Sequence, residues 1–303
     1  MRLPVVFLLC SLLAAAGQAA EPTLADVHYG PHERHVLDFF KAASEGPTPV
    51  LIFFHGGGFR GGDKGVFRER ADGFLLAGIS VISANYRLNY QATYPAPMLD
   101  GARVVQFVRW KAKQWNIDPS RVALSGSSAG ATMALWIALH DDLADPASPD
   151  PVARISTRVS CASVKNGPSS MDPEFILKYL GATELGAMLA LHGVKTREEY
   201  MTPKMRKQAL DASPLEHASP DDPPLFLDYA GDLTPTPLPA DTRFGVWIHH
   251  PRFGELLKEK CDKLGLVCHF YHRGKPAPAG AELAFLRKAF NRAAGQKAEG
   301  GRQ

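Results

Sequence analysis

The sequence lacks several features that would place it in a common class of protein. Its formal net charge is only +3 over 303 residues, and no basic run is present. Nucleic-acid binding is therefore not expected. Beyond the first residues, no segment is apolar and long enough to cross a membrane. Internal repeats and low-complexity stretches are also absent, so the length predicts one large domain with a substantial core.

Cysteine is scarce. Only four cysteines occur, and no Cys/His cluster has the spacing of metal ligands, so we expect no structural zinc and no other metal site. Cys10 lies in the apolar N-terminal segment. Of the remaining three, Cys261 and Cys268 flank a helix-to-strand turn and are the candidate pair for one disulfide, which leaves at least one free thiol.

The N-terminus resembles a secretory leader. Arg2 precedes the apolar run PVVFLLCSLLAAA, and small residues follow in GQAAEP. This pattern predicts a signal peptide over residues 1–20, cleaved near Ala19 or Ala20, and a secreted or periplasmic protein. The alternative is an N-terminal anchor. The remaining chain is divided into one domain over residues 21–295 and a disordered tail over residues 296–303.

Apolar runs alternate with amphipathic segments along most of the chain. Because the runs are apolar on both faces, they predict a mostly parallel sheet covered by helices, which is an α/β fold. Residues 166–212 form a longer irregular insertion of the kind that lies over a site as a lid. Residues 233–248 are rich in proline and are expected to be a loop. The predicted strands are 49–57, 78–86, 121–126, 154–164, 224–231 and 266–274, and the predicted helices are 67–78, 94–115, 129–143, 250–265 and 281–294.

The stretch LSGSSAG places a G-x-S-x-G motif at residues 126–130. A strand precedes the motif and a helix follows it, which is the context of a nucleophile elbow. The glycines permit a sharp turn, and Ser128 is held at its tip. Ser128 is therefore the candidate nucleophile, and Ser127 is not.

A second glycine-rich segment, HGGGF at residues 55–59, follows an earlier strand. Backbone N–H groups of Gly57 and Gly58, together with that of Ala129, are predicted to form an oxyanion hole. We expect His55 to orient this loop rather than to transfer protons.

These motifs resemble those of the α/β-hydrolase superfamily, in its esterase/lipase type with an HGGG oxyanion loop. The chain is most similar to the secreted carbohydrate-esterase or feruloyl-esterase branch. The resemblance extends from about Tyr29 to Asn291 and includes HGGGFRGGDK, SANYRL, YPAPMLDGARVVQFVRW and NIDPSRVALSGSSAG. It implies the α/β-hydrolase fold with a small lid-like insertion, ester hydrolysis and no cofactor.

The resemblance also implies an acid residue in a loop after the next strand, where this chain reads DYAGDLTPTP. Asp232 lies past the strand end and is the best match, whereas Asp228 lies within the strand. The family's histidine is expected at residues 274–280, but that segment reads GKPAPAG and contains no histidine. A serine without a base is a poor nucleophile.

Three interpretations of the missing histidine remain open. In the first, His249 or His250, at the end of the loop that begins at Asp232, takes the proton of Ser128. In the second, His272 at the end of the last strand does so. In the third, the triad has degenerated and the fold is kept for binding.

The expected function is hydrolysis of carboxylic esters, including acyl esters of carbohydrates, on a small-molecule or carbohydrate substrate. Ser128 attacks, His250 or His249 moves the proton, and Asp232 orients the imidazole. A non-catalytic binding protein and a peptidase are the alternatives.

Overall fold

The computed structural model describes residues 20–182 and 184–300, without the side chains of residues 296–300. In the described part, one eight-stranded sheet has the order β1-β2-β4-β3-β5-β6-β7-β8. Only the pairs β1–β2 and β2–β4 are antiparallel. The mostly parallel sheet predicted from the sequence is therefore confirmed. The strands are β1 Leu24–His28, β2 Val36–Phe40, β3 Thr48–Phe54, β4 Ser80–Ala84, β5 Ile117–Ser127, β6 Cys161–Lys165, β7 Leu225–Asp228 and β8 Cys268–Tyr271.

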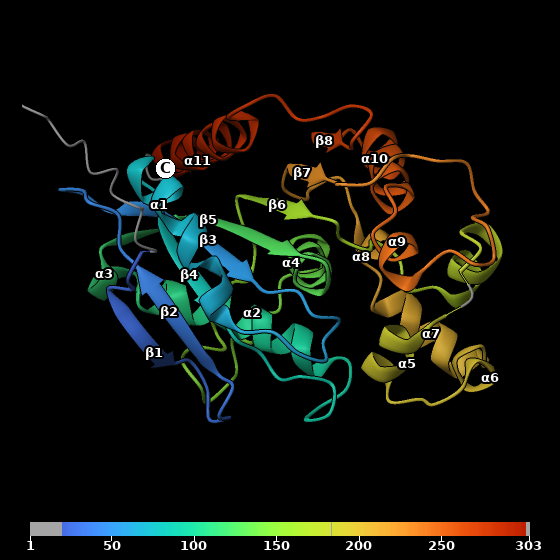
Figure 1. Ribbon diagram of the computed structural model, residues 1–303. Coiled ribbons are helices and arrows are strands. Elements are labelled where there is room, and N and C mark those ends of the chain that lie inside the picture. Colours follow the sequence, from blue (N-terminus) through green and yellow to red (C-terminus); the bar gives the residue numbers. More distant parts are fainter. Residues whose placement is uncertain (1–19, 183, 301–303) are drawn as a thin grey trace, which may run out of the picture.

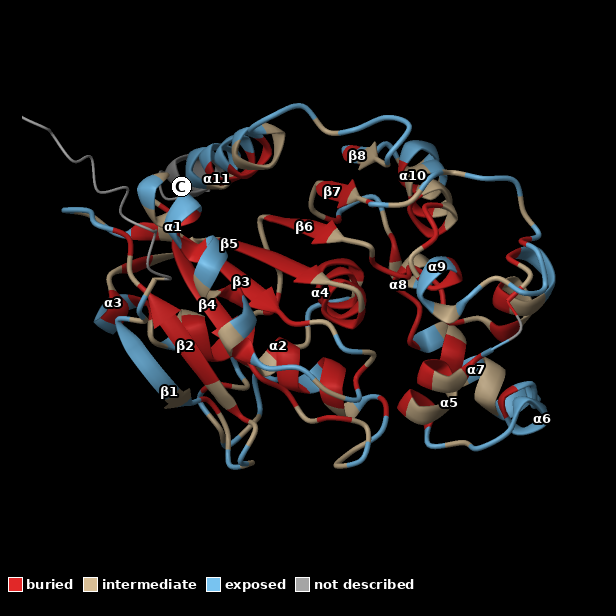
Figure 2. Cartoon of the chain, in the orientation of Figure 1, coloured by how far each residue is buried: buried red, intermediate tan, exposed pale blue. Residues whose placement is uncertain are grey.

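Both faces of the sheet are buried, as the continuous apolar runs require. Along β3, Val50 and Ile52 belong to the core on one face, while Leu51 and Phe53 belong to the core on the other. This alternation follows the two-residue period of a strand. Figure 2 shows the central strands almost entirely in the buried colour.

Helices cover the two faces unequally. Side chains of α1 and α11 contribute to the smaller core, and those of α2, α4 and α10 contribute to the larger one. Figure 1 shows α1 and α11 together on one side of the sheet, and α2 and α4 on the other. The helices are α1 Arg68–Leu76, α2 Ala96–Trp110, α3 Ala112–Trp115, α4 Ala129–Leu139, α10 Arg252–Leu264 and α11 Ala281–Gly300, with a 3₁₀ turn at Lys64–Phe67.

The insertion between β6 and β7 is helical and lies beyond the arrowheads of the parallel strands in Figure 1. Active sites of open α/β sheets form at this edge, where the strands end. The insertion therefore lies where a lid would have to lie. Its elements are a π-helical turn at Phe175–Tyr179, then α5 Gly186–His192, α6 Arg197–Tyr200, α7 Pro203–Asp211 and α8 Pro214–His217.

Several boundaries differ from those predicted by a few residues, and three differences change the description more. The strand expected over 154–164 begins only at Cys161, because Thr157 is held to Asp142 and Arg158 to Asp222 in a loop. A short helix, α9 Phe244–Trp247, interrupts the segment expected to be a loop. The last helix continues through Gly300, past the expected start of the tail at residue 296.

The thiols of Cys161, Cys261 and Cys268 are free and buried, so the expected disulfide is not formed in the structure. Cys261 and Cys268 are nevertheless in contact, and a hydrogen bond from Cys268 lowers the pKa of Cys261. The expected signal peptide lies almost wholly outside the described residues. None of the helices in the described ranges combines the length and the apolar character needed to cross a membrane.

Candidate active site

Ser128 lies at the turn between β5 and α4, as the sequence predicted. Its backbone is strained, with φ 54° and ψ −120°, a combination that residues other than glycine rarely adopt. A Cβ on Gly126 would lie 2.3 Å from the Gly130 carbonyl oxygen, and one on Gly130 would lie 2.1 Å from that of Phe54. Only glycine fits at either position, so the motif holds the turn tightly enough to force Ser128 into this conformation.

His249 supplies the imidazole that the sequence lacks at residues 274–280. Its Nε2 lies 2.8 Å from the Oγ of Ser128, which is a hydrogen-bonding distance. The ring comes from the segment directly after α9, 121 residues further along the chain than the serine. The first of the three interpretations made from the sequence therefore has the geometry that it requires.

The neighbouring His250 has a different role. Its Nε2 lies 2.9 Å from the hydroxyl of Thr234, and its Nδ1 accepts a hydrogen bond of 3.1 Å from the backbone N–H of Arg252. That N–H belongs to the first turn of α10, where backbone donors have no partner within the helix. His250 therefore accepts a hydrogen bond from the start of α10 and lies one residue before the N-cap residue Pro251.

His272, the other candidate base, lines neither cavity that His249 lines. Its backbone forms a bridge with Lys275, and its ring lies 5.4 Å from that of Phe270. The structure thus brings one of the three candidate histidines to the serine.

The environment of His249 favours the neutral form of its ring. Burial lowers the pKa of His249, and a hydrogen bond with the backbone of Gly245 opposes that shift. Because Nε2 faces Ser128, the Gly245 contact falls to the other ring nitrogen. A carbonyl can only accept, so Nδ1 carries the proton and Nε2 keeps a lone pair toward the serine hydroxyl.

Asp232 does not reach His249, contrary to the role expected for it. Its Oδ2 forms an ion pair of 3.1 Å with Nη1 of Arg273, and the backbone N–H of Arg273 donates to the Gly231 carbonyl at 3.0 Å. Both contacts join the loop after β7 to the end of β8. Asp232 and His249 line one cavity of about 370 Å³, but no hydrogen bond joins them.

Asp228, the other carboxylate considered, lies at the end of β7. Its Oδ2 is 3.4 Å from the ammonium of Lys165 on the adjacent strand β6. Neither carboxylate has a hydrogen bond or ion pair with the imidazole, and the backbone of Gly245 is the group that opposes the lowering of the His249 pKa. The spacing of residues in the sequence could not indicate a backbone carbonyl in place of a carboxylate, because every residue has a backbone carbonyl.

The predicted oxyanion hole lies beside the serine. Gly57, Gly58 and Ala129 all line the same cavity as Ser128 and His249. Ala129 is the first residue of α4, where a backbone N–H has no acceptor within the helix. Among the described residues, no backbone acceptor takes the N–H of Gly57 or Gly58. These donors are free to bind an oxygen atom of a substrate.

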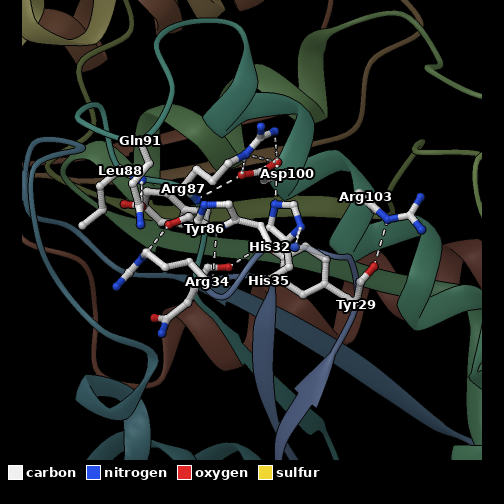
Figure 3. A network of polar contacts seen from close by, with 11 residues as sticks. Tyr29, His32, Arg34, His35, Tyr86, Arg87, Leu88, Gln91, Asp100 and Arg103 are labelled. Carbon is white, nitrogen blue, oxygen red and sulfur yellow. Dashed lines mark hydrogen bonds and ion pairs between the residues drawn. The ribbon is translucent and has the colours of Figure 1, made fainter.

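Aromatic and cationic side chains stabilise the glycine loop by stacking and hydrogen bonds. The ring of His55 stacks on that of Tyr86 with centroids 4.4 Å apart, and the Tyr86 hydroxyl donates to the His55 carbonyl at 2.7 Å. Arg34 donates to the carbonyls of Tyr86 and Gly62 at 2.8 and 3.0 Å. Figure 3 shows Arg34 beside Tyr86 in this network.

His55 is itself uncharged in this setting. It is only 1% exposed, and burial lowers its pKa to about 4. Its Nδ1 lies 2.7 Å from the Gly56 carbonyl, and its Nε2 lies 3.2 Å from Nη2 of Arg34. A guanidinium can only donate, so Nε2 accepts and Nδ1 carries the proton. His55 therefore orients the loop, as expected from the sequence.

Asp100 anchors the other end of this network. Its carboxylate accepts hydrogen bonds from the backbone and side chain of Arg87 and lies 3.0 Å from Nε2 of His35. Figure 3 shows these groups converging on Asp100, which is only 3% exposed. The network fixes the segment after β4 against α2, and through Tyr86 it fixes the glycine loop.

A cavity of about 430 Å³ surrounds Ser128 and His249. This volume is in the range of sites for small ligands. The insertion supplies part of its wall through α5, and α9 supplies another part. Within the described ranges, no group of three or more His, Cys, Asp or Glu residues could hold a metal ion. The apolar side chains of the wall include Phe59, Met171, Ala187, Met188, Leu191, Phe244 and Ile248.

The chain matches a known protein family. The family model BD-FAE matches residues 37–232, which is well over half of the chain and includes the glycine loop, the nucleophile elbow and Asp232. His249 lies beyond the matched region.

Individual relatives match part of this chain. Esterase LipI of Mycobacterium tuberculosis is 39% identical over 95 residues, which cover 30% of this chain and 29% of the relative. The probable carboxylic ester hydrolase LipM of the same organism is 28% identical over 207 residues, or 67% of this chain and 46% of the relative. The chain spans less than half the length of either protein.

Solved structures share the fold. A truncated carbohydrate esterase from gut microbiota has a TM-score of 0.67 at 19% identity and covers 93% of this chain and 100% of its own. The acetyl ester-xyloside bifunctional hydrolase of Caldicellulosiruptor lactoaceticus has a TM-score of 0.64 at 24% identity, with 88% of each chain covered. These likenesses confirm the α/β-hydrolase fold.

Proposed function

The chain belongs to the BD-FAE family and has the α/β-hydrolase fold, and on that basis we propose that it hydrolyses carboxylic esters. The observation that carries the proposal is the 2.8 Å contact between His249 Nε2 and Ser128 Oγ in a cavity that the glycine loop also lines. The names of the curated relatives LipI and LipM support the same chemistry.

The geometry accounts for each proton in the reaction. Ser128 Oγ attacks the ester carbonyl while Nε2 of His249 takes the hydroxyl proton. The N–H groups of Gly57, Gly58 and Ala129 bind the oxyanion, and collapse of the intermediate transfers the proton to the departing alcohol. Water then attacks the acyl-enzyme by the same route, and the carboxylic acid leaves.

The backbone of Gly245 acts in place of a carboxylate. Its hydrogen bond keeps the proton of the neutral ring on Nδ1 and supports the imidazolium that forms during attack. A carbonyl dipole stabilises a cation less than a full negative charge does, so we expect a slower esterase than one with an acid at this position.

We further propose acyl esters of carbohydrates as substrates and export from the cell. Of the two solved structures named above, one is a carbohydrate esterase and the other an acetyl ester-xyloside bifunctional hydrolase, which supports the first part. The leader-like residues 1–20 support the second. N-terminal sequencing of the native protein should find a chain that begins near Ala20 or Glu21, and an intact Met1 would contradict export.

A fluorophosphonate probe tests the catalytic proposal. It reacts with a serine only where a base and an oxyanion hole activate the hydroxyl. Mass spectrometry should locate the label on Ser128 in the wild type and in the matched control Ser127→Ala, and should find none in Ser128→Ala. A well-folded protein that neither reacts with the probe nor hydrolyses short-chain aryl esters would favour the binding-protein alternative.

A further inference from the structure

The catalytic cavity contains one permanently charged side chain. Apart from His249, the lining residues are glycines, small polar residues and apolar residues, with Arg60 as the single exception. A guanidinium contributes nothing to binding an aliphatic acyl chain. Arg60 is exposed, so its charge is hydrated while the site is empty and is available to a polar group of the substrate.

The backbone of Arg60 is fixed to the oxyanion loop. Its N–H donates to the Gly57 carbonyl at 3.0 Å, and the preceding Phe59 carbonyl accepts from the backbone of Asn89 at 2.7 Å. Arg60 lies two residues after Gly58, which we place in the oxyanion hole. The backbone of Arg60 is thus fixed beside the glycine loop, at the wall of the cavity that Ser128 lines.

The side chain of Arg60 has no polar partner within the described residues. The neighbouring arginines differ in this respect, since Arg34 donates to two carbonyls and Arg87 is paired with Asp100. Nε of Arg60 lies 3.8 Å from where a Cβ of Gly58 would stand, and Nη1 lies 3.9 Å from where a Cβ of Gly186 would stand. The guanidinium therefore reaches from the glycine loop to the start of α5.

One carboxylate lies in the neighbourhood. Oε1 of Glu184 is also 3.9 Å from the position that a Gly186 Cβ would take, but it forms no ion pair with Arg60 within 4.0 Å. Glu184 does not line the cavity. Its negative charge lowers the positive electrostatic potential at Arg60, but it does not form an ion pair with the guanidinium.

We propose that Arg60 binds a carboxylate carried by the ester substrate, so that the enzyme prefers anionic esters over neutral esters of the same size. The fork of a guanidinium matches a carboxylate by two parallel hydrogen bonds, and such charge-assisted bonds are stronger than neutral ones. The inference rests on the ester hydrolysis proposed above. The carboxylate belongs either to the acid half of the ester, as in a dicarboxylic half-ester, or to the alcohol half.

Two pairs of synthetic esters separate these sources. Mono-4-nitrophenyl glutarate and 4-nitrophenyl valerate have acyl chains of equal length and differ by a terminal carboxylate on the acid side. The butyrate esters of 4-hydroxybenzoate and of its methyl ester differ by a carboxylate on the alcohol side. For each pair, the measured quantity is the ratio of kcat/KM for the anionic ester to kcat/KM for the neutral one.

Arg60→Gln should lower this ratio about tenfold for one pair, in line with loss of a charge-assisted hydrogen bond. Arg287→Gln is the matched control, because Arg287 is exposed on α11 and lines none of the cavities described. It removes the same charge and should leave both ratios within twofold. Glu184→Gln should raise the ratio that Arg60→Gln lowers, since it removes the competing negative charge.

An unchanged ratio for both pairs in Arg60→Gln, with the neutral esters still hydrolysed, would overturn the inference and leave the proposed function intact. An equal decrease of the ratio in Arg60→Gln and Arg287→Gln would also overturn it. Such a result would indicate that the preference for anionic esters comes from the electrostatic field of the whole protein. Hydrolysis of none of the four esters by the wild type would overturn the proposed function and this inference with it.

Discussion

Replacement of Asp232 by Asn separates two accounts of how the His249 imidazole is oriented. In a Ser-His-Asp unit, the carboxylate fixes the tautomer and stabilises the imidazolium. In this structure Asp232 is paired with Arg273, and the backbone of Gly245 contacts His249 instead. The substitution keeps the size of the side chain and removes only its charge.

The structure sets the size of the expected effect. The side chains of Asp232 and Arg273 are 51% and 68% exposed, and exposed ion pairs contribute about 0.2–1 kcal/mol. Loss of this pair should therefore change the loop only slightly, and kcat/KM should fall by no more than about threefold. An acid member of a triad would behave differently, since its change to the amide lowers kcat by about 10⁴.

The assay is the hydrolysis of a short-chain aryl ester by Asp232→Asn, with Asp228→Asn as the matched control. Asp228 carries the same charge at the end of β7 and pairs with Lys165 rather than with the loop. Both variants should retain most of the wild-type kcat/KM. A loss of more than a hundredfold in Asp232→Asn alone, with unchanged circular dichroism, would refute the role assigned to Gly245.

Further outcomes follow from the strained and buried groups of the site. Burial lowers the pKa of His249 and the base must be neutral, so kcat/KM should rise with pH through a midpoint below 6.5, and a midpoint above it would contradict the assignment. Ser128→Gly and Ser128→Ala should both be inactive, but urea unfolding should find the glycine variant more stable by about 1–2 kcal/mol, because it relieves the positive φ. The pKa of His55 is lowered from 6.5 to about 4, so the stability it contributes is present above pH 6.5 and is lost as the pH falls toward 4. Between pH 7 and pH 5 the loss should be about 2 kcal/mol, and His55→Gln should remove that part.

The sheet and the position of Ser128 at a strand-to-helix turn could be predicted from the sequence because both depend on local patterns. Buried strands such as β3 and β4 are continuous apolar runs, and the elbow at Ser128 needs glycine at two fixed positions. The same reasoning failed for residues 154–160, which precede β6 and were predicted to belong to its strand. The β-branched residues of this segment alternate with polar ones as in a strand, but Thr157 and Arg158 bind Asp142 and Asp222, which are 15 and 64 residues away in the sequence, and these contacts hold the segment as a loop.

The candidate site was only partly predictable. The position of His249 and His250 at the end of the loop that begins at Asp232 indicated the correct pair, but not which ring faces the serine. That choice depends on α9, a four-residue helix in a proline-rich segment, and on the hydrogen bond from the start of α10 to His250. The pairing of Asp232 with Arg273 is set by contacts between two strand ends, which no local spacing encodes.

The assignment of His249 as the base of Ser128 is tested most directly by comparing His249→Ala with His250→Ala in aryl ester hydrolysis. We expect His249→Ala to lose at least a thousandfold in kcat/KM and to keep only residual catalysis from the oxyanion hole. His250→Ala loses the hydrogen bond to the first turn of α10, which costs about 1 kcal/mol of stability, and should stay within tenfold of the wild type. The opposite order, or an undiminished rate in His249→Ala, would contradict the account.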